Sequence, residues 1–430
     1  MAVATAPPPP IRLPGRAYVL GLLTVVYTFN FIDRQILAIL LPAIKAEFAL
    51  SDTVLGFLAG PAFALFYATL GVPIALLADR WNRRNVIALA LAIWSGMTAL
   101  SGAAVNVTQL ALARIGVGIG EAGCSPPAHS IIADLYGPQE RATAMGIFTL
   151  GISAGIMLAY LAGGWVAQNV GWREAFFIVG VPGLALAVVL RFTMDEPRRG
   201  LSEGRPDLSD RPPLAGVLRF LLARRSFLHL AAGSALAAFN GYAVISWFPT
   251  FLGRTHGMDL STIGLWLGLI LGIAGGIGLA GGGWVLDRLG RRGARRSLLG
   301  VTAALLVGWL FHVLVLLAPN EHSALALFVI PVMFSQVYLP AAFAQVQGLV
   351  PLRMRAVASA LLLFILNSIG LGLGPQLAGM LSDALTPWLG AEALRYSLLA
   401  VGALILPWSA WHFARAGRWI ERDLVRADGV

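Results

Sequence analysis

Long apolar runs, separated by short charged or turn-forming breaks, make up most of the chain. A membrane-spanning helix needs about 20 mainly apolar residues, and the sequence contains twelve blocks of that kind. The blocks are 17–44, 54–78, 85–105, 108–133, 142–168, 172–193, 227–252, 260–286, 297–318, 323–350, 356–382 and 393–414. The pattern therefore predicts an all-α membrane protein with twelve transmembrane helices.

A single long polar stretch, 194–225, divides the twelve blocks into two groups of six. Its sequence includes EPRRGLSEGRPDLSDRPP, which is typical of a linker. We therefore expect two six-helix bundles, 17–193 and 226–414, joined by a cytoplasmic linker. The Pro-rich segment 1–16 is expected to be a disordered cytoplasmic tail, and 415–430 a second cytoplasmic tail.

Composition and charge support this topology. Hydrophobic residues make up 58% of the chain and charged residues only 12%, whereas soluble domains carry about 25% charged residues. The net charge of +10 does not indicate a nucleic-acid partner, because the basic residues fall between apolar blocks rather than in one run. Of the 31 Lys and Arg residues, only four (Lys45, Arg173, Arg254 and Arg395) lie on the side opposite the termini, and two lie within spans. Both termini are thus expected in the cytoplasm, with the chain in a bacterial inner membrane, as a monomer.

The two halves repeat. The loop after the second span reads ALLADRWNRR and the loop after the eighth reads GWVLDRLGRR. Asp79, Arg80 and Arg84 thereby match Asp287, Arg288 and Arg292 at an offset of 208 residues. Arg141 after span four and Arg355 after span ten match at nearly the same offset. Parallel six-helix repeats are a transporter architecture.

With these loops in place, the chain resembles the major facilitator superfamily over its whole span region. The DRxxRR and DRxGRR loops are the most specific marks, although Ala75 and Asn82 stand where the family often has Gly. Within the superfamily, the segments NFIDRQI, GIGEAGCSPPAHSIIADLY and GWREAFFIVGVPG resemble the Spinster branch. The resemblance implies a major facilitator fold and a lipid-like substrate, because animal Spinster proteins transport sphingosine phosphate or lysolipids.

The charged loop residues have two readings. They set topology as positive loops, and their regular spacing also favours a gate that forms in one conformation and breaks in another. We predict that the eight matched residues hold cytoplasmic charge networks when the opposite side is open.

Four ionisable residues, Asp33, Arg34, Arg114 and Glu121, lie deep within spans of the first half. A charge at mid-membrane costs at least ~2.5–3.5 kcal/mol on insertion scales. Depth along the helices places Asp33 between Arg114 and Glu121, which are seven residues apart and share one face of span four. We expect Asp33 to meet span four and Arg34 to point elsewhere, since neighbouring side chains diverge by about 100°.

These charges predict coupling chemistry in the first half. Burial disfavours the charged form of a carboxyl group and a nearby arginine favours it, so a change of access on either side changes proton affinity. Asp33 and Glu121 are therefore predicted to carry protons, while Arg34 and Arg114 could hold a phosphate or carboxylate headgroup. The alternative is a pair of ion bridges that only hold helices together.

The second half lacks counterparts, because Asp33 aligns with Ala243 and no buried acid or base is expected centrally in spans seven to twelve. We expect it to supply an apolar, hydrogen-bonding wall, which suits an amphipathic solute better than a sugar. The predicted substrate-binding residues are Arg34, Arg114, Asn30, Tyr27, Asn240, Tyr338 and Asn367.

The function predicted is secondary active transport by alternating access, coupled to protons, of a small amphipathic, lysolipid-like and anionic solute. GIGEAG and GISAG match nucleotide-binding and nucleophile motifs but lie inside spans, where small residues serve helix packing. No metal-ligand or cofactor pattern is present. A membrane-embedded lipid-modifying enzyme, a sugar or drug transporter and a non-transporting receptor remain as alternatives.

Overall fold

The computed structural model describes residues 15–199, 214–351 and 354–428, and the regular secondary structure of these residues is helical throughout. The first half contains α1 (Arg16–Phe48), α2 (Asp52–Ala59), α3 (Pro61–Arg80), α4 (Arg83–Gly102), α5 (Val107–Glu121), α6 (Ser125–Leu135), α7 (Pro138–Asn169) and α8 (Trp172–Thr193). The second half contains α9 (Leu214–Leu222), α10 (Arg225–His256), α11 (Leu260–Leu269), η1 (Ile270–Ala274), α12 (Gly275–Gly290), α13 (Ala294–Leu316), α14 (Glu321–Ser335), α15 (Tyr338–Gly348), α16 (Arg355–Ile365), η3 (Leu366–Leu371), α17 (Gly372–Leu389), η4 (Gly390–Glu392) and α18 (Ala393–Asp428).

The twelve predicted spans are confirmed as twelve helical segments, several of which are interrupted. Helices α2–α3, α5–α6, α11–η1–α12, α14–α15 and α16–η3–α17 each form one segment. Length and hydropathy alone identify ten candidate spans among the described residues. The difference arises because α5 and α6 are each too short to qualify, while one candidate, Val357–Val425, contains the last two spans.

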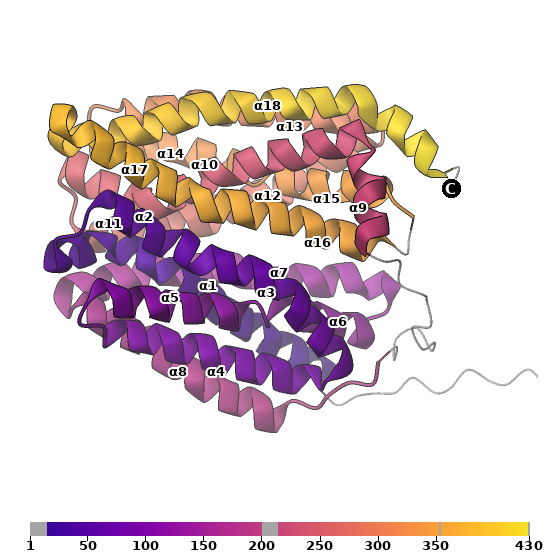
Figure 1. Cartoon of the computed structure of the whole chain (residues 1–430), viewed down its shortest axis with the longest axis horizontal. Helices are drawn as coiled ribbons and strands as arrows, with labels where there is room; N and C mark the ends of the chain where they lie inside the picture. The colour runs from indigo at the N-terminus through magenta and orange to yellow at the C-terminus, as the bar shows by residue number, and fades with distance from the viewer. Residues whose placement is uncertain (1–14, 200–213, 352–353, 429–430) are drawn as a thin grey trace, which may run out of the picture.

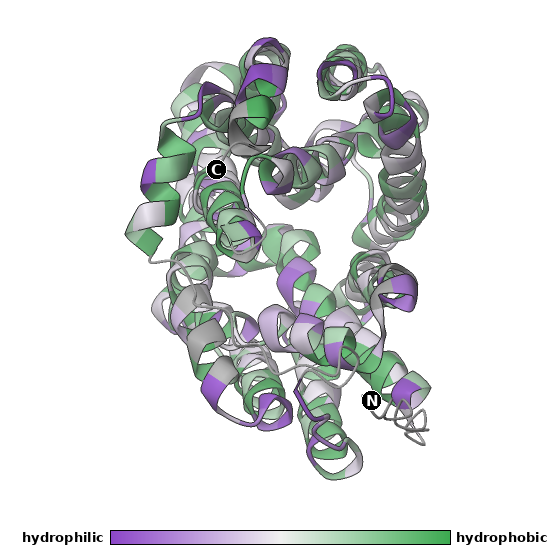
Figure 2. Cartoon of the chain, turned by 90° about the vertical axis from the view of Figure 1, so that its right-hand side faces the viewer, coloured by the Kyte–Doolittle hydropathy of each residue, from purple (hydrophilic) through white to green (hydrophobic). Residues whose placement is uncertain are grey.

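The two bundles lie side by side, with the ends of α8, α9 and α18 on the same side of the molecule (Figure 1). We call this side the linker side and the opposite one the far side. Viewed from the linker side, the ribbon is largely green and white, with scattered purple, hydrophilic segments (Figure 2).

The repeat is visible in matching details of local structure. Ser51 and Asp259, 208 residues apart, cap α2 and α11 by accepting the backbone N–H of the third residue on. Spans four and ten are both broken near their middle, between α5 and α6 and between α14 and α15. Arg141 donates to the carbonyl of Ala133, and Arg355 to the carbonyl of Gln347, eight residues earlier in each case.

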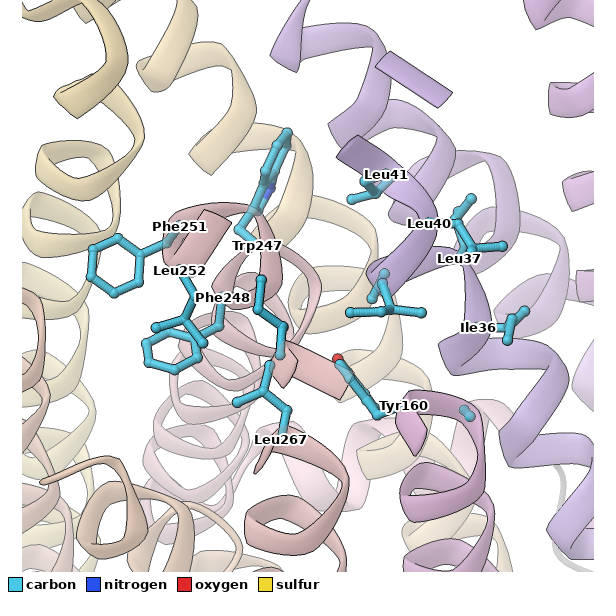
Figure 3. Packing of buried hydrophobic residues seen from close by; sticks show 14 of the residues in the cluster. Ile36, Leu37, Leu40, Leu41, Tyr160, Trp247, Phe248, Phe251, Leu252 and Leu267 are labelled. Carbon is cyan, nitrogen blue, oxygen red and sulfur yellow. The ribbon is translucent and has the colours of Figure 1, made fainter. Parts of the chain in front are cut away.

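The bundles pack against each other toward the far side. One hydrophobic cluster joins Ile36, Leu37, Leu40 and Leu41 of α1 to Tyr160 of α7, to Trp247, Phe248, Phe251 and Leu252 of α10, and to Leu267 of α11 (Figure 3). The Tyr160 hydroxyl crosses between bundles and donates to the carbonyl of Ile245 at 2.6 Å. Burial of large apolar side chains from both halves stabilises this closed far side.

Glycines bring the far-side helices into backbone contact. A Cβ built on Gly164 of α7 would lie 2.4 Å from the Leu260 carbonyl oxygen, and one on Gly264 of α11 would lie 2.3 Å from the Tyr160 carbonyl oxygen. A Cβ on Gly379 of α17 would similarly meet the Asp52 carbonyl oxygen at 2.2 Å. No side chain larger than hydrogen fits these crossings unless the two bundles separate.

The segments around the bundles differ from the expected tails and linker. Residues 1–14 and 200–213 lie outside the described residues, but the last part of the linker forms the short helix α9, which buries Val217 and Leu221. Helix α18 continues through most of the segment expected to be a tail. Asp423, in that continuation, accepts hydrogen bonds from the Ser226 N–H (3.0 Å) and hydroxyl (2.7 Å) and thereby caps α10.

Candidate functional site

The first half contains a buried charge cluster formed by Asn30, Asp33, Arg34, Arg114 and Glu121. Helix α1 carries the first three residues and α5 carries the last two. The exposed fractions of Asp33, Arg114 and Glu121 are 0%, 2% and 1%. The prediction that these in-span charges gather at one place is therefore confirmed.

A strong ion pair joins the two helices within the cluster. Arg34 donates from Nε (2.8 Å) and Nη2 (2.6 Å) to Glu121 Oε2, and Nη2 also reaches Asn30 Oδ1 at 3.4 Å. The Arg34 guanidinium also faces aromatic rings, with its Cζ 4.8 Å from the centre of Phe31 and 4.7 Å from that of Tyr67. Aromatic faces attract a cation in an apolar site, so they hold Arg34 in place if Glu121 becomes protonated.

The expected partners of Asp33 and Arg34 were wrong. Arg34, rather than Asp33, meets Glu121 on span four, while Asp33 Oδ2 accepts from the Ser95 hydroxyl of α4 at 3.2 Å. Arg114 Nη1 donates to the backbone carbonyl of Asp33 at 3.3 Å rather than to its carboxylate. Packing against α7 and α8 sets the rotation of α1 about its own axis. Depth and spacing along a single helix give no information about that rotation.

Several polar atoms of the cluster are buried without a hydrogen-bond partner: Asn30 Nδ2, Asp33 Oδ1, Arg114 Nε and Glu121 Oε1. Buried unsatisfied groups are rare in native proteins because each loses its hydration without compensation. Both carboxyl groups thus retain an oxygen that can take a proton without breaking an existing hydrogen bond.

The cluster faces the other bundle across a narrow cavity. Arg34, Arg114 and Phe63 line it from the first half, and Tyr242, Ile245 and Ser246 of α10 line it from the second. A second cavity continues from Ile245 into the C-terminal bundle and occupies about 690 Å³, open solvent included. Its walls are mostly apolar, with Asn240, Ser335, Gln336 and His312 as polar residues. The two cavities share Ile245, so cationic and apolar surfaces adjoin.

The second half has a buried base at the wall of the larger cavity, which the sequence pattern did not reveal. His312 of α13 is 4% exposed, lines the larger cavity, and has its Nε2 3.3 Å from the Leu398 carbonyl oxygen. The expectation of no buried acid or base in the central parts of spans seven to twelve was therefore wrong for span nine. His312 is a lone histidine in a strongly apolar run, so the surrounding sequence does not show that its side chain faces the cavity.

The other predicted substrate-binding residues do not all lie at the cavity wall. Asn240 is buried at the cavity wall with its Oδ1 unpartnered. Tyr27 lies on α1, about one turn from Asn30, and its ring stacks on that of Phe148 with 4.2 Å between the ring centres. Asn367 lies half-buried in the π-helical turn η3. Tyr338 instead packs in the core of the C-terminal bundle, 6.3 Å from the ring of Phe413.

On the linker side, the predicted gate residues act within their own halves. The Arg84 N–H donates to Glu196 at 2.9 Å, and its guanidinium donates to the Met194 carbonyl at 3.0 Å. In the second half, Asp287 is exposed, and no ion pair is formed there by Asp287, Arg288 or Arg292 among the described residues. Arg80 is also exposed, while the side chain of Asp79 lies outside the described part of the structure.

Arg83 is the buried residue of the first loop, although it was not among the predicted gate residues. It is 1% exposed, pairs with Asp134 of α6, and donates to Glu196 at 2.8 Å and to the Pro197 carbonyl at 2.8 Å. Asn82, where the family often has Gly, caps α4 through the Asn85 N–H at 2.9 Å. The loop therefore fastens the start of the linker to α4 and α6.

A second charged site, the far-side ion cluster, consists of Lys45, Asp52, Arg254, Ser382 and Asp383. Asp52 is 1% exposed and accepts from Lys45 at 2.5 Å, from two Arg254 nitrogens at 2.6 and 2.7 Å, and from the Ser382 hydroxyl at 2.7 Å. Asp383 accepts the N–H groups of Asp52 and Thr53, at 2.9 and 2.7 Å. Arg254, Ser382 and Asp383 belong to the second half, so the cluster ties the two bundles together.

Among the described residues, no group of three or more His, Cys, Asp or Glu side chains could hold a metal ion. The carboxylates of the buried charge cluster and of the far-side ion cluster instead pair with Arg, Lys, Ser and backbone N–H groups.

Comparisons with known proteins agree with this architecture. The family model of the Major Facilitator Superfamily matches residues 23–375. The chain is 36% identical to an MFS-type efflux pump of Mycolicibacterium smegmatis over 96% of this chain and 95% of that protein. It is 30% identical to human protein spinster homolog 1, over 96% of this chain and 83% of that protein.

A solved structure of a related protein has the same fold. The chain matches the crystal structure of a bacterial homolog to the human lysosomal transporter Spinster, in an inward-facing and unoccupied conformation. The TM-score is 0.85 at 34% identity, and the match covers 96% of this chain and 98% of that chain.

Proposed function

Because the chain belongs to the major facilitator superfamily and resembles its Spinster branch, we propose that it is a proton-coupled transporter of a small anionic, amphipathic solute. Secondary transporters of this architecture work by alternating access around a site between their repeats. The observation that carries the proposal is the buried charge cluster, whose carboxyl groups adjoin two arginines at the wall of an inter-bundle cavity.

In this proposal, Asp33 and Glu121 take up and release protons. Asp33 faces Ser95, the backbone-bound Arg114 and the other carboxyl group, Glu121, while Glu121 faces Arg34 and Asn30. Protonation of Glu121 would release Arg34 from the one carboxylate with which it pairs among the described residues. Arg34 would then be available to bind the anionic group of a solute in the cavity, by charge-assisted hydrogen bonds.

The second half contributes the wall for the apolar part of the solute. Its cavity residues are predominantly apolar, and Asn240 and Gln336 offer hydrogen bonds at isolated points. A sugar needs hydrogen-bond partners around its whole ring, since unpaired hydroxyls are costly to bury. The contrast between a cationic first half and an apolar second half therefore favours an amphipathic solute.

The closed far side supports an inward-facing conformation, with the linker side in the cytoplasm as the arginine distribution predicts. In this state the gate residues Asp287, Arg288 and Arg292 form no ion pair across the bundles within the described part of the chain. This agrees with charge networks that form only when the far side opens. Single cysteines at Gly200 and His322 should react only from the cytoplasm and only from outside, respectively; the reverse labelling would exclude this orientation.

The proposed function is tested by a binding panel on the purified full-length protein. Lysophospholipids and sphingoid phosphates should raise the thermal-unfolding midpoint more than sugars or cationic drugs of similar size, because ligands stabilise the folded state that binds them. Arg114→Ala should weaken binding of anionic amphipaths by about tenfold more than that of neutral ones, as expected for loss of one charge-assisted contact. Stabilisation by cationic drugs alone would instead support an efflux pump for drugs.

A further inference from the structure

A stripe of exposed and half-buried residues runs along α18 on the outer surface of the C-terminal bundle, away from the first bundle (Figure 1). Spaced by four, three, four and three residues, it consists of Leu404, Trp408, Trp411, Arg415 and Arg418. Leu404, Trp408 and Trp411 are 72%, 54% and 46% exposed. This spacing keeps all five side chains on one helix face. Toward the linker side the stripe changes from aliphatic to aromatic to cationic.

Beside this stripe, a pair of histidines joins α10 to α18. The Nδ1 atoms of His229 and His412 are 2.9 Å apart, so one ring donates its proton to the other. In the neutral pair, one Nε2 is therefore an N–H donor and the other an acceptor. The Trp411 ring packs edge-on against both histidines, at 5.6 and 4.8 Å between ring centres.

The cations of the stripe lack acidic partners. Arg415 lies 5.2 Å from the ring centre of Trp411, and neither Arg415 nor Arg418 pairs with a carboxylate among the described residues. The nearby acids of α18 point elsewhere: Asp423 is bonded to Ser226, and Glu421 approaches the backbone of Gly293. The surface formed by α10 and α18 thus has a positive end with no acidic partner among the described residues.

The order of these groups matches a phospholipid. An acyl chain would lie along Leu404, the glycerol region at Trp408 and Trp411, and the phosphate at Arg415 and the histidine pair. Trp side chains favour the interfacial level of a membrane, and basic pockets between helices on the cytoplasmic side bind anionic headgroups. We propose that this surface, formed by His229 of α10 and by Trp408, Trp411, His412 and Arg415 of α18, binds an anionic phospholipid of the surrounding leaflet.

Lipid titration followed by native mass spectrometry tests the proposal on the full-length, detergent-purified protein. The first phosphatidylglycerol should bind about tenfold more tightly than phosphatidylcholine with the same chains, because its headgroup carries a net negative charge. Arg415→Gln and His412→Gln should each remove most of this preference while leaving phosphatidylcholine binding unchanged. A preference that is absent in the wild-type protein would overturn the proposal.

Arg191→Gln is the matched control. Arg191 is also an exposed arginine at the linker-side end of a helix, α8, and lies 5.6 Å from the ring centre of Phe192, but it has no histidine pair beside it. It should leave the preference unchanged, and an equal loss in this variant would mean only general attraction to a positive surface. Millimolar glycerol phosphate should not displace phosphatidylglycerol; complete displacement would identify a site for soluble anions and contradict the lipid assignment.

Discussion

Asp33→Asn is expected to abolish uptake driven by a pH gradient while leaving the protein folded. Asparagine keeps the shape of the side chain and can still accept from the Ser95 hydroxyl, but it cannot take up a proton. The measurement is solute uptake into proteoliposomes with and without an imposed pH gradient. Solute binding should also depend less on pH in this variant, by linkage, because one of the two titrating carboxyl groups is lost.

Asp259→Asn is the control for this experiment. Asp259 is an exposed cap of α11, and hydrogen bonds from the N–H and hydroxyl of Thr262 hold the pKa of its carboxyl below the ordinary value. It therefore stays ionised across the neutral range, and asparagine is an equally good cap. This variant should transport with the pH dependence of the wild-type protein. If Asp33→Asn behaves the same way, coupling does not pass through Asp33.

Gly264→Leu is expected to hold the far side open and to stop transport. Its Cβ alone would lie 2.3 Å from the Tyr160 carbonyl oxygen and 3.0 Å from the Gly164 Cα, so α7 and α11 cannot keep their present contact. The contact lies between bundles rather than within one, and each bundle should still fold. Spin labels at Val105 and His322 should move apart on the far side, while labels at Gln139 and Arg292 should approach on the linker side.

The matched substitution for Gly264 is Gly281→Leu in the same span. A Cβ on Gly281 of α12 meets nothing within 4 Å, so the added side chain should leave the label distances and transport close to those of the wild-type protein. Unchanged distances in Gly264→Leu would show that the far-side helix crossing does not control which side is open.

The sequence was sufficient for the spans and for the location of the buried charges, because both follow from the cost of polar groups in lipid. Twelve apolar blocks predict twelve helical segments, and Asp33, Arg34, Arg114 and Glu121 stand out within them. Which charge pairs with which was not predictable. It depends on the rotation of α1 and α5 about their axes, and this is set by packing with several other helices at once.

The far-side ion cluster was missed for a different reason. Asp52 and Arg254 are 202 residues apart, and each lies at the end of a span, where a charged residue is ordinary. Only the closure of the two bundles brings them together and buries Asp52. Arg83 was missed likewise, since its burial requires the linker residue Glu196 to fold back onto α4. Contacts that depend on conformation or on long-range packing leave no local pattern in a single sequence.

We propose above all that the buried charge cluster exchanges protons as the solute crosses the membrane. The most direct test measures proton movement driven by a solute gradient in proteoliposomes that start without a pH gradient, using a trapped pH-sensitive dye. The proposal predicts a pH change with the wild-type protein that a proton ionophore dissipates and that is absent with Asp33→Asn. Solute movement with no accompanying proton movement in the wild-type protein would contradict it.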